Sequence, residues 1–362
     1  MENVEKRVRH TEVDIAKAIC IVGMVFVHVY EAFLFTNLVV GTFPEVLVNV
    51  IQTLVGAPCF MFCMGASIVF SSSTPEQTIK RGIHIFILAY ILNITRGGIL
   101  SLIVSLIQKR PMEKTFLAVI NEVLQIDILP FAGLALMLVG ILKKYKFNEI
   151  KICIVAVILS IIGSFTRGIN AGFIPNYFVG LFLGVVNPVL EEATYFPLFH
   201  WFIFVAFGYL FGSILKNSTN KTKTYGKFIP VCLIVVIVYL IYAIPNRIGM
   251  LSSDLTYYYQ LTTIEAFISI SSCIVYLGLL YFLSFILPKF ILNLCYSFSS
   301  NINEIYCIHW VFLENFTIIM FRVFNIYSLP RYMCLLLALF TITGSYLIAI
   351  YIRNRKKEKY EN

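Results

Sequence analysis

Long apolar runs separated by short polar segments make up most of the chain. Each run is close to the roughly 20 residues that a helix needs to cross a bilayer. Residues 115–126 (TFLAVINEVLQI) predict a separate interfacial or re-entrant helix leading into the short fourth run. The pattern predicts an all-α, polytopic membrane protein with about ten transmembrane helices. The runs lie at about 13–34, 45–70, 82–106, 127–142, 150–167, 197–215, 228–244, 263–286, 303–323 and 332–352.

Composition agrees with a membrane protein. Of the 362 residues, 59% are hydrophobic and 13% charged, and the mean hydropathy is +0.86, far from the norm of soluble proteins. The apolar runs leave no room for a large soluble domain. We therefore expect a cytoplasmic amino-terminal segment (1–12), one transmembrane domain (13–352) and a basic cytoplasmic tail (353–362). The first run lacks a small-residue cleavage site and carries Asp14, so it predicts an uncleaved anchor.

The distribution of Lys and Arg predicts the orientation of the chain, because cytoplasmic loops retain these residues. With the amino terminus inside, 20 of the 28 lie on the cytoplasmic side, seven lie outside, and Arg96 lies within the membrane. Both termini are then cytoplasmic, in a multi-pass protein of the cell membrane. Loop lysines that bind anionic lipid headgroups account for the net charge of +9 without a nucleic-acid partner.

The nine cysteines are scattered singly through the apolar runs, with no C-x-x-C pair and no Cys/His cluster of metal-binding spacing. They predict buried packing thiols, and the sequence predicts no metal site.

Polar residues inside the first run raise the question of function. A charge in hydrocarbon costs about 3 kcal/mol on insertion scales, so such residues are rarely kept without a use. At 100° per residue, Asp14, Lys17, His28 and Glu31 share one side of the helix. Asp14 and His28 are about 21 Å apart along the axis. This stripe predicts a path from the cytoplasmic mouth to the outer half of the membrane.

His28 is the candidate for chemistry in that stripe. An ordinary histidine exchanges protons near neutral pH, and a neutral imidazole can accept a proton from an alcohol or an amine. Glu31, one turn further on, could hold its tautomer or stabilise the imidazolium, and Asp14 is a second supporting carboxylate. The alternative is a histidine that is only hydrogen-bonded to a neighbouring helix.

Further polar residues lie at or near membrane depth, and so many together predict a water-accessible or ligand-filled interior. The segment TYFPLFHWFIF, with His200 and Trp201, fits either an aromatic belt or the rim of an acceptor site. The candidate substrate-binding residues are Asn93, Arg96, Gln125, Asp127, His200 and His309.

The segment IKRGIHIF, at the cytoplasmic end of the third run, places two cations and a histidine at the membrane surface. They fit positive-inside anchoring or a clamp for the phosphates of a donor such as coenzyme A. The candidate donor-binding residues are Lys17, Lys80, Arg81 and His84.

Three stretches resemble the heparan-α-glucosaminide N-acetyltransferase catalytic-domain family, within the transmembrane acyltransferase superfamily related to acyltransferase family 3. They are RHTEVDIAKAICIVGMVFVHV, LVGAPCFMFCMGASIVFSSS and FPLFHWFIFVAFGYLFGSIL. NEVLQIDILPFAGLAL and NINEIYCIHWVF are similar to later parts of the family, so the resemblance touches most of residues 9–320.

The resemblance implies an acyltransferase that uses acetyl-coenzyme A (acetyl-CoA) on the cytosolic side and acylates a sugar on the far side, with a membrane histidine central to the reaction. Two positions depart from the family. Its Arg-Gly pair reads Lys17-Ala18 here, and the lysosomal branch has Asn in place of the first-helix histidine and a histidine in the next loop. No histidine lies between His28 and His84 in this chain, which makes His28 the candidate.

Three functions stay open at this point. The first is O- or N-acylation of a cell-surface glycan or glycolipid, with His28 as general base or transient acyl carrier. The second is transport of a polar or lipid-linked metabolite through the same polar residues. In the third, the polar residues only lock helices together. The acceptor, the acyl group and the oligomeric state, a homodimer included, are also open.

Overall fold

The computed structural model describes residues 9–33, 50–71, 73–187, 192–252 and 255–361. Residues 1–8 of the expected cytoplasmic segment and 45–49 of the second apolar run lie outside this description. Most of the described chain is helical, and each of the ten apolar runs falls on a helix. This confirms the all-α, polytopic membrane fold.

Eight helical segments in the described residues are long and apolar enough to span a membrane. A bent pair, α6 (Met112–Leu124) and α7 (Ile128–Lys144), would make a ninth span, with 44° between its halves. The expected number of about ten also counted α8 (Glu149–Phe165), whose 17 residues are at the lower limit for a span. The eight are α1 (Thr11–Phe33), η2 (Gln52–Gly56) with α3 (Ala57–Phe70), α4 (Pro75–Asn93) with η3 (Ile94–Gly98) and α5 (Ile99–Ile107), α10 (Leu198–Asn217), α11 (Lys221–Asn246), α13 (Thr263–Leu283), α15 (Ile302–Arg322) and α16 (Arg331–Glu361).

Short elements connect these spans. A two-stranded antiparallel ribbon pairs β1 with β2, and the interfacial helix expected at 115–126 is α6. The remaining short elements are α9 (Phe173–Val179), β1 (Val186–Asn187), β2 (Glu192–Ala193), the 3-10 helix η4 (Gly249–Leu251), α12 (Leu255–Tyr259) and α14 (Lys289–Ser300).

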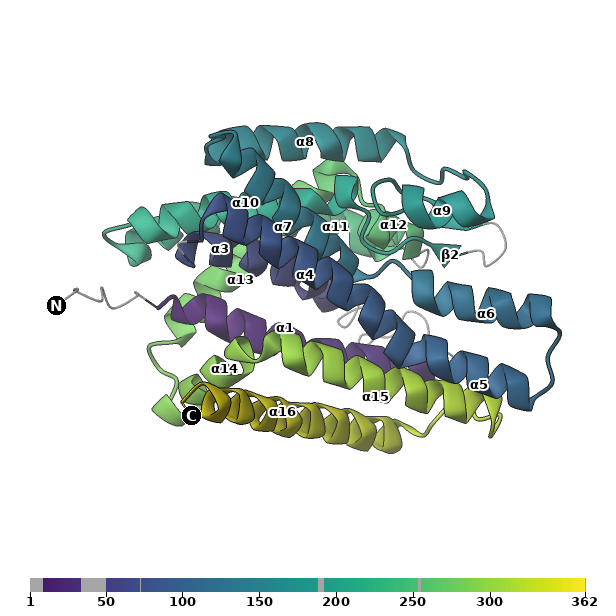
Figure 1. Cartoon of the computed structure of the whole chain (residues 1–362). Coiled ribbons are helices and arrows are strands. Elements are labelled where there is room, and N and C mark those ends of the chain that lie inside the picture. Colours follow the sequence, from purple (N-terminus) through teal and green to yellow (C-terminus); the bar gives the residue numbers. More distant parts are fainter. Residues whose placement is uncertain (1–8, 34–49, 72, 188–191, 253–254, 362) are drawn as a thin grey trace.

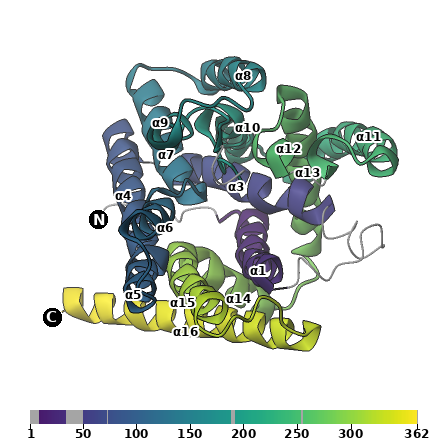
Figure 2. The same ribbon diagram turned by 90° about the vertical axis from the view of Figure 1, so that its right-hand side faces the viewer.

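The helices surround α1. It contacts α3, α13, α14, α15 and α16, so its side chains reach several elements at once. In Figure 2, α16 forms one outer layer below α14 and α15, and α8 lies at the opposite face. Figure 1 shows that α1 begins and α16 ends at the same end of the molecule, which is the predicted cytoplasmic end.

Local sequence explains where key helices begin and how closely they pack. Thr74 and Gln77 form a capping box that starts α4. Helix α4 packs along α7 at Gly82, where a Cβ atom would lie 2.7 Å from the carbonyl oxygen of Gly133. Glycine lets these two backbones approach, as is common between membrane helices.

Candidate active site

A large cavity lies beside the carboxyl-terminal half of α1. Its volume is about 690 Å³. Side chains from α1, η2, α12, α13 and α16 line it, and His28, Glu31, Gln52, Asp127 and Arg331 are its charged or strongly polar members. The apolar part of the wall includes Ile19, Gly23, Met24, Val27, Ile51, Val55, Gly56, Ala57, Ile128, Phe196, Leu335 and Ala338.

His28 and Glu31 meet at this cavity. Nδ1 of His28 lies 3.4 Å from Oε2 of Glu31, and Nε2 of Gln52 donates a hydrogen bond of 2.9 Å to Oε1 of Glu31. A carboxylate only accepts, so Nδ1 is the donor in this contact, and in the neutral imidazole Nε2 then keeps its lone pair. No described residue hydrogen-bonds Nε2 of His28. The imidazole is therefore held in the tautomer that can accept a proton.

Aromatic side chains of α15 cover the other side of His28. The Trp310 ring centroid is 4.2 Å from that of His28, and the His309 ring is stacked with it at 5.9 Å. His309 is fully buried, and its Nδ1 donates a hydrogen bond of 3.1 Å to the carbonyl oxygen of Ile305. His309 thus packs its ring against His28, while its own hydrogen bond is to the backbone of α15.

Arg96 and Asp127 form a buried ion pair near the same cavity. Nη1 of Arg96 lies 2.9 Å from Oδ2 of Asp127, and Nη2 donates a hydrogen bond of 2.8 Å to Oε1 of Gln125. The hydroxyl of Tyr306 donates to Oδ2 of Asp127 at 3.1 Å. Asn93 donates to the backbone carbonyl of Gln125 at 2.9 Å, which fixes the turn between α6 and α7.

A π-helical segment, η3 (Ile94–Gly98), brings Arg96 into this cluster. A Cβ atom on Gly97 would lie 2.5 Å from a carboxylate oxygen of Glu122, so a side chain here would displace the end of Glu122. π-helical turns are frequent at functional sites because they redirect one side chain. The guanidinium of Arg96 also lies over the Trp310 ring, 4.6 Å from its centroid. Trp310 thus connects the ion pair to His28.

A second, smaller cavity lies toward the predicted cytoplasmic end. Its volume is about 70 Å³, and Lys17, Ser67, Arg81, Asn303 and Tyr306 supply its polar lining. Nζ of Lys17 donates a hydrogen bond of 2.5 Å to the Ser67 hydroxyl. The site therefore has two cations at one end.

The two cavities meet at one wall. Ile128 lines both cavities, and the hydrogen bond between Tyr306 and Asp127 joins a residue of the small cavity to a residue of the large one. Nη1 of Arg96 bonds the same carboxylate oxygen of Asp127, Oδ2. This wall separates His28 from Lys17 and Arg81.

Two aromatic hydroxyls border the large cavity outside the spans. Tyr258 and Tyr259 belong to α12, and both line the cavity. Burial, with Glu31 nearby, raises the pKa of both phenols above the usual range. Both residues therefore remain neutral and can donate hydrogen bonds.

The structure thus brings together most of the residues expected from the sequence. His28, Glu31 and Asp127 line the large cavity, and Asn93, Arg96, Gln125 and His309 pack behind its wall. Lys17 and Arg81 line the small cavity.

Asp14 and His200 lie apart from both groups. Asp14 accepts hydrogen bonds of 2.7 Å from Arg9 and 2.5 Å from Ser299, about 21 Å from His28 along α1. Neither cavity is lined by Asp14 or His200. His200 is fully buried in α10 and bonded through Nδ1 to the carbonyl oxygen of Leu261 at 2.9 Å. These contacts hold Asp14 and His200 within the helix packing.

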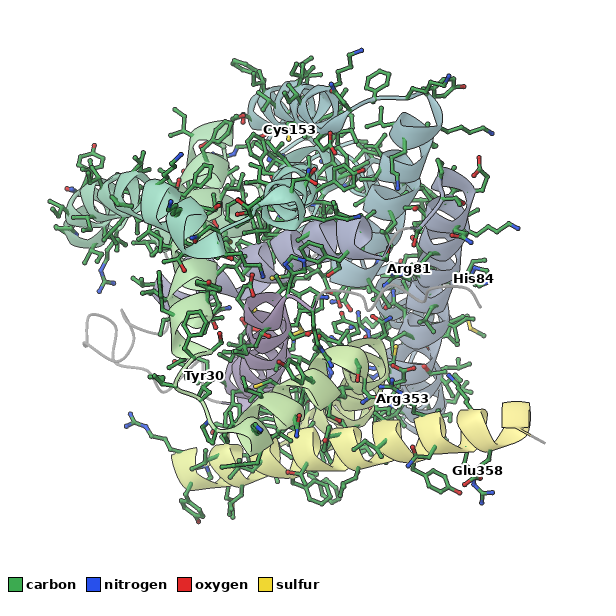
Figure 3. All side chains as sticks on the ribbon, turned by 90° about the vertical axis from the view of Figure 1, so that its left-hand side faces the viewer. Tyr30, Arg81, His84, Cys153, Arg353 and Glu358 are labelled. Atoms are coloured by element: carbon green, nitrogen blue, oxygen red, sulfur yellow. The ribbon has the colours of Figure 1, made fainter. Side chains whose placement is uncertain are left out.

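Lys80 and His84 are exposed at the predicted cytoplasmic end. Nδ1 of His84 donates to the backbone carbonyl of Lys80 at 2.7 Å. In Figure 3, His84 lies on the outer side of α4, whereas Arg81 lies toward the neighbouring helices. Only Arg81 of the three lines the small cavity.

Tyr306 and Trp310 are site residues that the sequence pattern did not single out. Together with His309 they lie three and four residues apart on α15, and therefore share one helix face. That spacing is the sequence signal from which Tyr306 and Trp310 could have been identified. Among the described residues, no three His, Cys, Asp or Glu side chains are arranged to hold a metal ion.

Comparison with models of protein families shows to which family the chain belongs. The model described as heparan-alpha-glucosaminide N-acetyltransferase, catalytic, matches residues 9–246, more than half of the 362-residue chain. The chain belongs to this family. It is therefore a multi-pass membrane protein with an acetyltransferase-like function. Comparisons with curated proteins and with solved structures found no match.

The family match covers only part of the site. It includes His28, Glu31, Arg96 and Asp127, which belong to residues 9–246. Tyr306, His309 and Trp310 lie beyond the matched region, on α15, yet they contact these residues. The carboxyl-terminal helices of this chain thus complete the wall around the residues of the family region.

Proposed function

We propose that this protein transfers an acetyl or other acyl group from cytosolic acyl-CoA to a hydroxyl or amine of a sugar on the far side of the cell membrane. The acceptor is a glycan or glycolipid. The observation that carries the proposal is His28, which faces the large cavity with Nδ1 directed at Glu31 and its other nitrogen unbonded by the described residues.

The donor would approach from the predicted cytoplasmic end. Lys17 and Arg81 in the small cavity suit the phosphates of coenzyme A, since cation-to-phosphate hydrogen bonds are about twice as strong as neutral ones. Lys80 and His84, one turn apart at the surface, extend the same basic patch. The flexible pantetheine arm would then carry the thioester past the wall of Ile128 and Tyr306 toward His28.

The acyl transfer needs one base. Nε2 of His28 takes the proton from the acceptor hydroxyl or amine, and the oxygen or nitrogen attacks the thioester carbonyl. The carbon–sulfur bond then breaks, and the thiolate of coenzyme A takes the proton from the imidazolium. Glu31 stabilises the imidazolium in between, and such a base contributes about 100- to 10,000-fold in rate.

Acceptor contacts would come from the polar residues of the large cavity. Gln52 and the hydroxyls of Tyr258 and Tyr259 can donate hydrogen bonds to a sugar. The buried cluster of Asn93, Arg96, Gln125 and Asp127 supports this wall. We assign His309 to packing against His28 and give Asp14 and His200 no contact with substrate.

The direct test uses purified protein in lipid nanodiscs with acetyl-CoA carrying a labelled acetyl group. We expect saturable donor binding and slow release of acetate or transfer to added sugars. A transporter of a polar or lipid-linked metabolite would show neither. Absence of both binding and acetyl release with wild-type protein would refute the proposed function.

A further inference from the structure

The large cavity has a polar end and an apolar end along α1. His28 and Glu31 lie near the outer end of the helix, while Ile19 and Gly23 line the cavity about two and a half and one and a half turns before His28. At 1.5 Å per residue, Ile19 and His28 are about 13 Å apart along the axis. The apolar part therefore extends from the reacting group toward the middle of the membrane.

The cavity borders the lipid. Ile19, Ile51 and Leu335 line it from three different parts of the chain and remain 45%, 54% and 52% exposed. Within a membrane-spanning segment, such exposed aliphatic side chains meet hydrocarbon. An apolar chain could therefore enter the cavity sideways without leaving the lipid phase.

Two glycines leave space in that part of the wall. Gly23 of α1 and Gly56 of η2 both line the cavity, and a Cβ atom on either would meet nothing within 4 Å. Glycine inside a helix costs about 1 kcal/mol relative to alanine. No neighbouring atom is close enough to require glycine at either position. The effect of these two glycines is therefore the open space beside them.

A cation, Arg331, lies at the outer end of the large cavity. Arg331 begins α16 at the predicted outer surface, lines the cavity, and makes no hydrogen bond or ion pair with the rest of the described chain. Arginine binds phosphate through a planar fork of donors. The cavity thus combines, in its outer part, a cation and a sugar-sized polar region at His28 and Gln52, and it has an apolar region further inward.

We propose that the acceptor is a sugar joined through a phosphate to a lipid chain. This inference rests on the proposed acyltransferase function. The phosphate lies at Arg331, the sugar reaches His28, and the chain lies against Gly23, Gly56 and Ala338 toward the middle of the membrane. The order matches a lipid of the outer leaflet, whose headgroup lies outside and whose chain points inward.

The test uses a photoreactive dodecyl phosphate, with a diazirine in the chain, added to the full-length protein in nanodiscs. We expect labelling of α1 and α16 near Gly23 and Ala338. Gly23→Leu fills the apolar space and should reduce this labelling about tenfold, because the chain loses its buried contacts. Gly23→Ala should reduce it less while leaving the fold intact.

Gly344→Leu is the matched control. Gly344 lies on α16 outside the cavity lining, and a Cβ atom there would likewise meet nothing within 4 Å, so this variant should label like the wild type. Arg331→Gln should weaken labelling by the phosphate probe but not by a dodecyl alcohol carrying the same diazirine. Equal labelling of wild type and Gly23→Leu, or labelling spread evenly over the lipid-facing side of α11, would overturn the inference.

An activity measurement separates this inference from the function on which it rests. Acetyl-CoA binding should be unchanged in Gly23→Leu, because the small cavity holds the donor. If wild type and Gly23→Leu acetylate a sugar carried on a lipid phosphate equally well, the lipid-linked acceptor is wrong and the acyltransferase remains. If the wild type binds the lipid probe but not acetyl-CoA, the acyltransferase is wrong instead.

Discussion

The imidazole rings of His28 and His309 lie parallel, 7° apart in plane and 5.9 Å apart between centroids, although they belong to α1 and α15. Each ring has its Nδ1 proton directed at an acceptor, Glu31 for His28 and the Ile305 carbonyl for His309. Only His28 lines the cavity. The pair therefore divides into one histidine able to react and one that packs against it.

The first prediction concerns His28. His28→Asn removes the base but keeps much of the size, so acyl transfer should fall about 100- to 10,000-fold. Donor binding and the thermal unfolding midpoint should stay near those of the wild type. Rates of acetyl release and transfer, measured with labelled acetyl-CoA in nanodiscs, check the first point, and a melting curve checks the second.

His200→Asn is the control for that experiment. His200 is buried, bonded to the Leu261 carbonyl and away from both cavities, so its replacement should cost about 1 to 3 kcal/mol of stability and leave the rate per folded molecule unchanged. Retained activity in His28→Asn would contradict a catalytic His28 and favour packing or transport.

The second prediction distinguishes the roles of two neighbouring cations of α4, Arg81 and Lys80. Arg81→Gln should raise the KM for acetyl-CoA by about 10- to 150-fold, since a charge-assisted phosphate hydrogen bond is worth about 1.5 to 3 kcal/mol. Lys80→Gln, at an exposed position outside the small cavity, should change it about twofold at most. Steady-state kinetics on both variants gives the comparison. Equal effects of the two changes would mean that the cavity does not hold the phosphates.

The third prediction concerns the Arg96–Asp127 pair. Asp127→Asn leaves the buried guanidinium without its charge partner, which costs about 3 to 5 kcal/mol, so the unfolding midpoint should fall by at least about 5 °C. The double variant with Arg96→Gln should recover part of that loss. Lys356→Gln, which breaks an exposed 3.9 Å contact with Glu304, should leave the midpoint unchanged. No loss in Asp127→Asn would mean that the pair does not support the fold.

Sequence reasoning located the helices and several polar residues for one physical reason. Polar groups such as His28 and Arg96 are costly in an apolar helix, so they stand out wherever a function or a partner keeps them. Tyr306 and Trp310 did not stand out, because aromatic residues are ordinary at membrane interfaces. Only the packing of α15 against α1 and η3 reveals their role.

The same dependence on tertiary packing explains why the sequence could not distinguish His200 from His309. His200 and His309 are each a single histidine in an apolar helix, and nothing in the local sequence distinguishes them. Their positions differ because α15 packs beside α1, whereas His200 packs near Gly163 of α8. The bend between α6 and α7 and the π-helical turn at Arg96 likewise depend on tertiary contacts, such as the fit of Gly97 to Glu122.

The last prediction concerns Tyr306 as the wall between the two cavities. Tyr306→Phe removes only its hydrogen bond to Asp127, which should cost about 1 kcal/mol of stability and change the transfer rate little. Tyr306→Ala removes the ring, joins the small cavity to the large one and admits water to the thioester. We expect acetyl release without acceptor to rise several-fold while transfer to acceptor falls. The ratio of free acetate to acetylated product measures this uncoupling, and because Tyr306→Phe keeps the ring, it must retain the wild-type ratio. If Tyr306→Ala keeps that ratio too, the donor does not pass this wall, and a route elsewhere along α1 would have to carry it to His28.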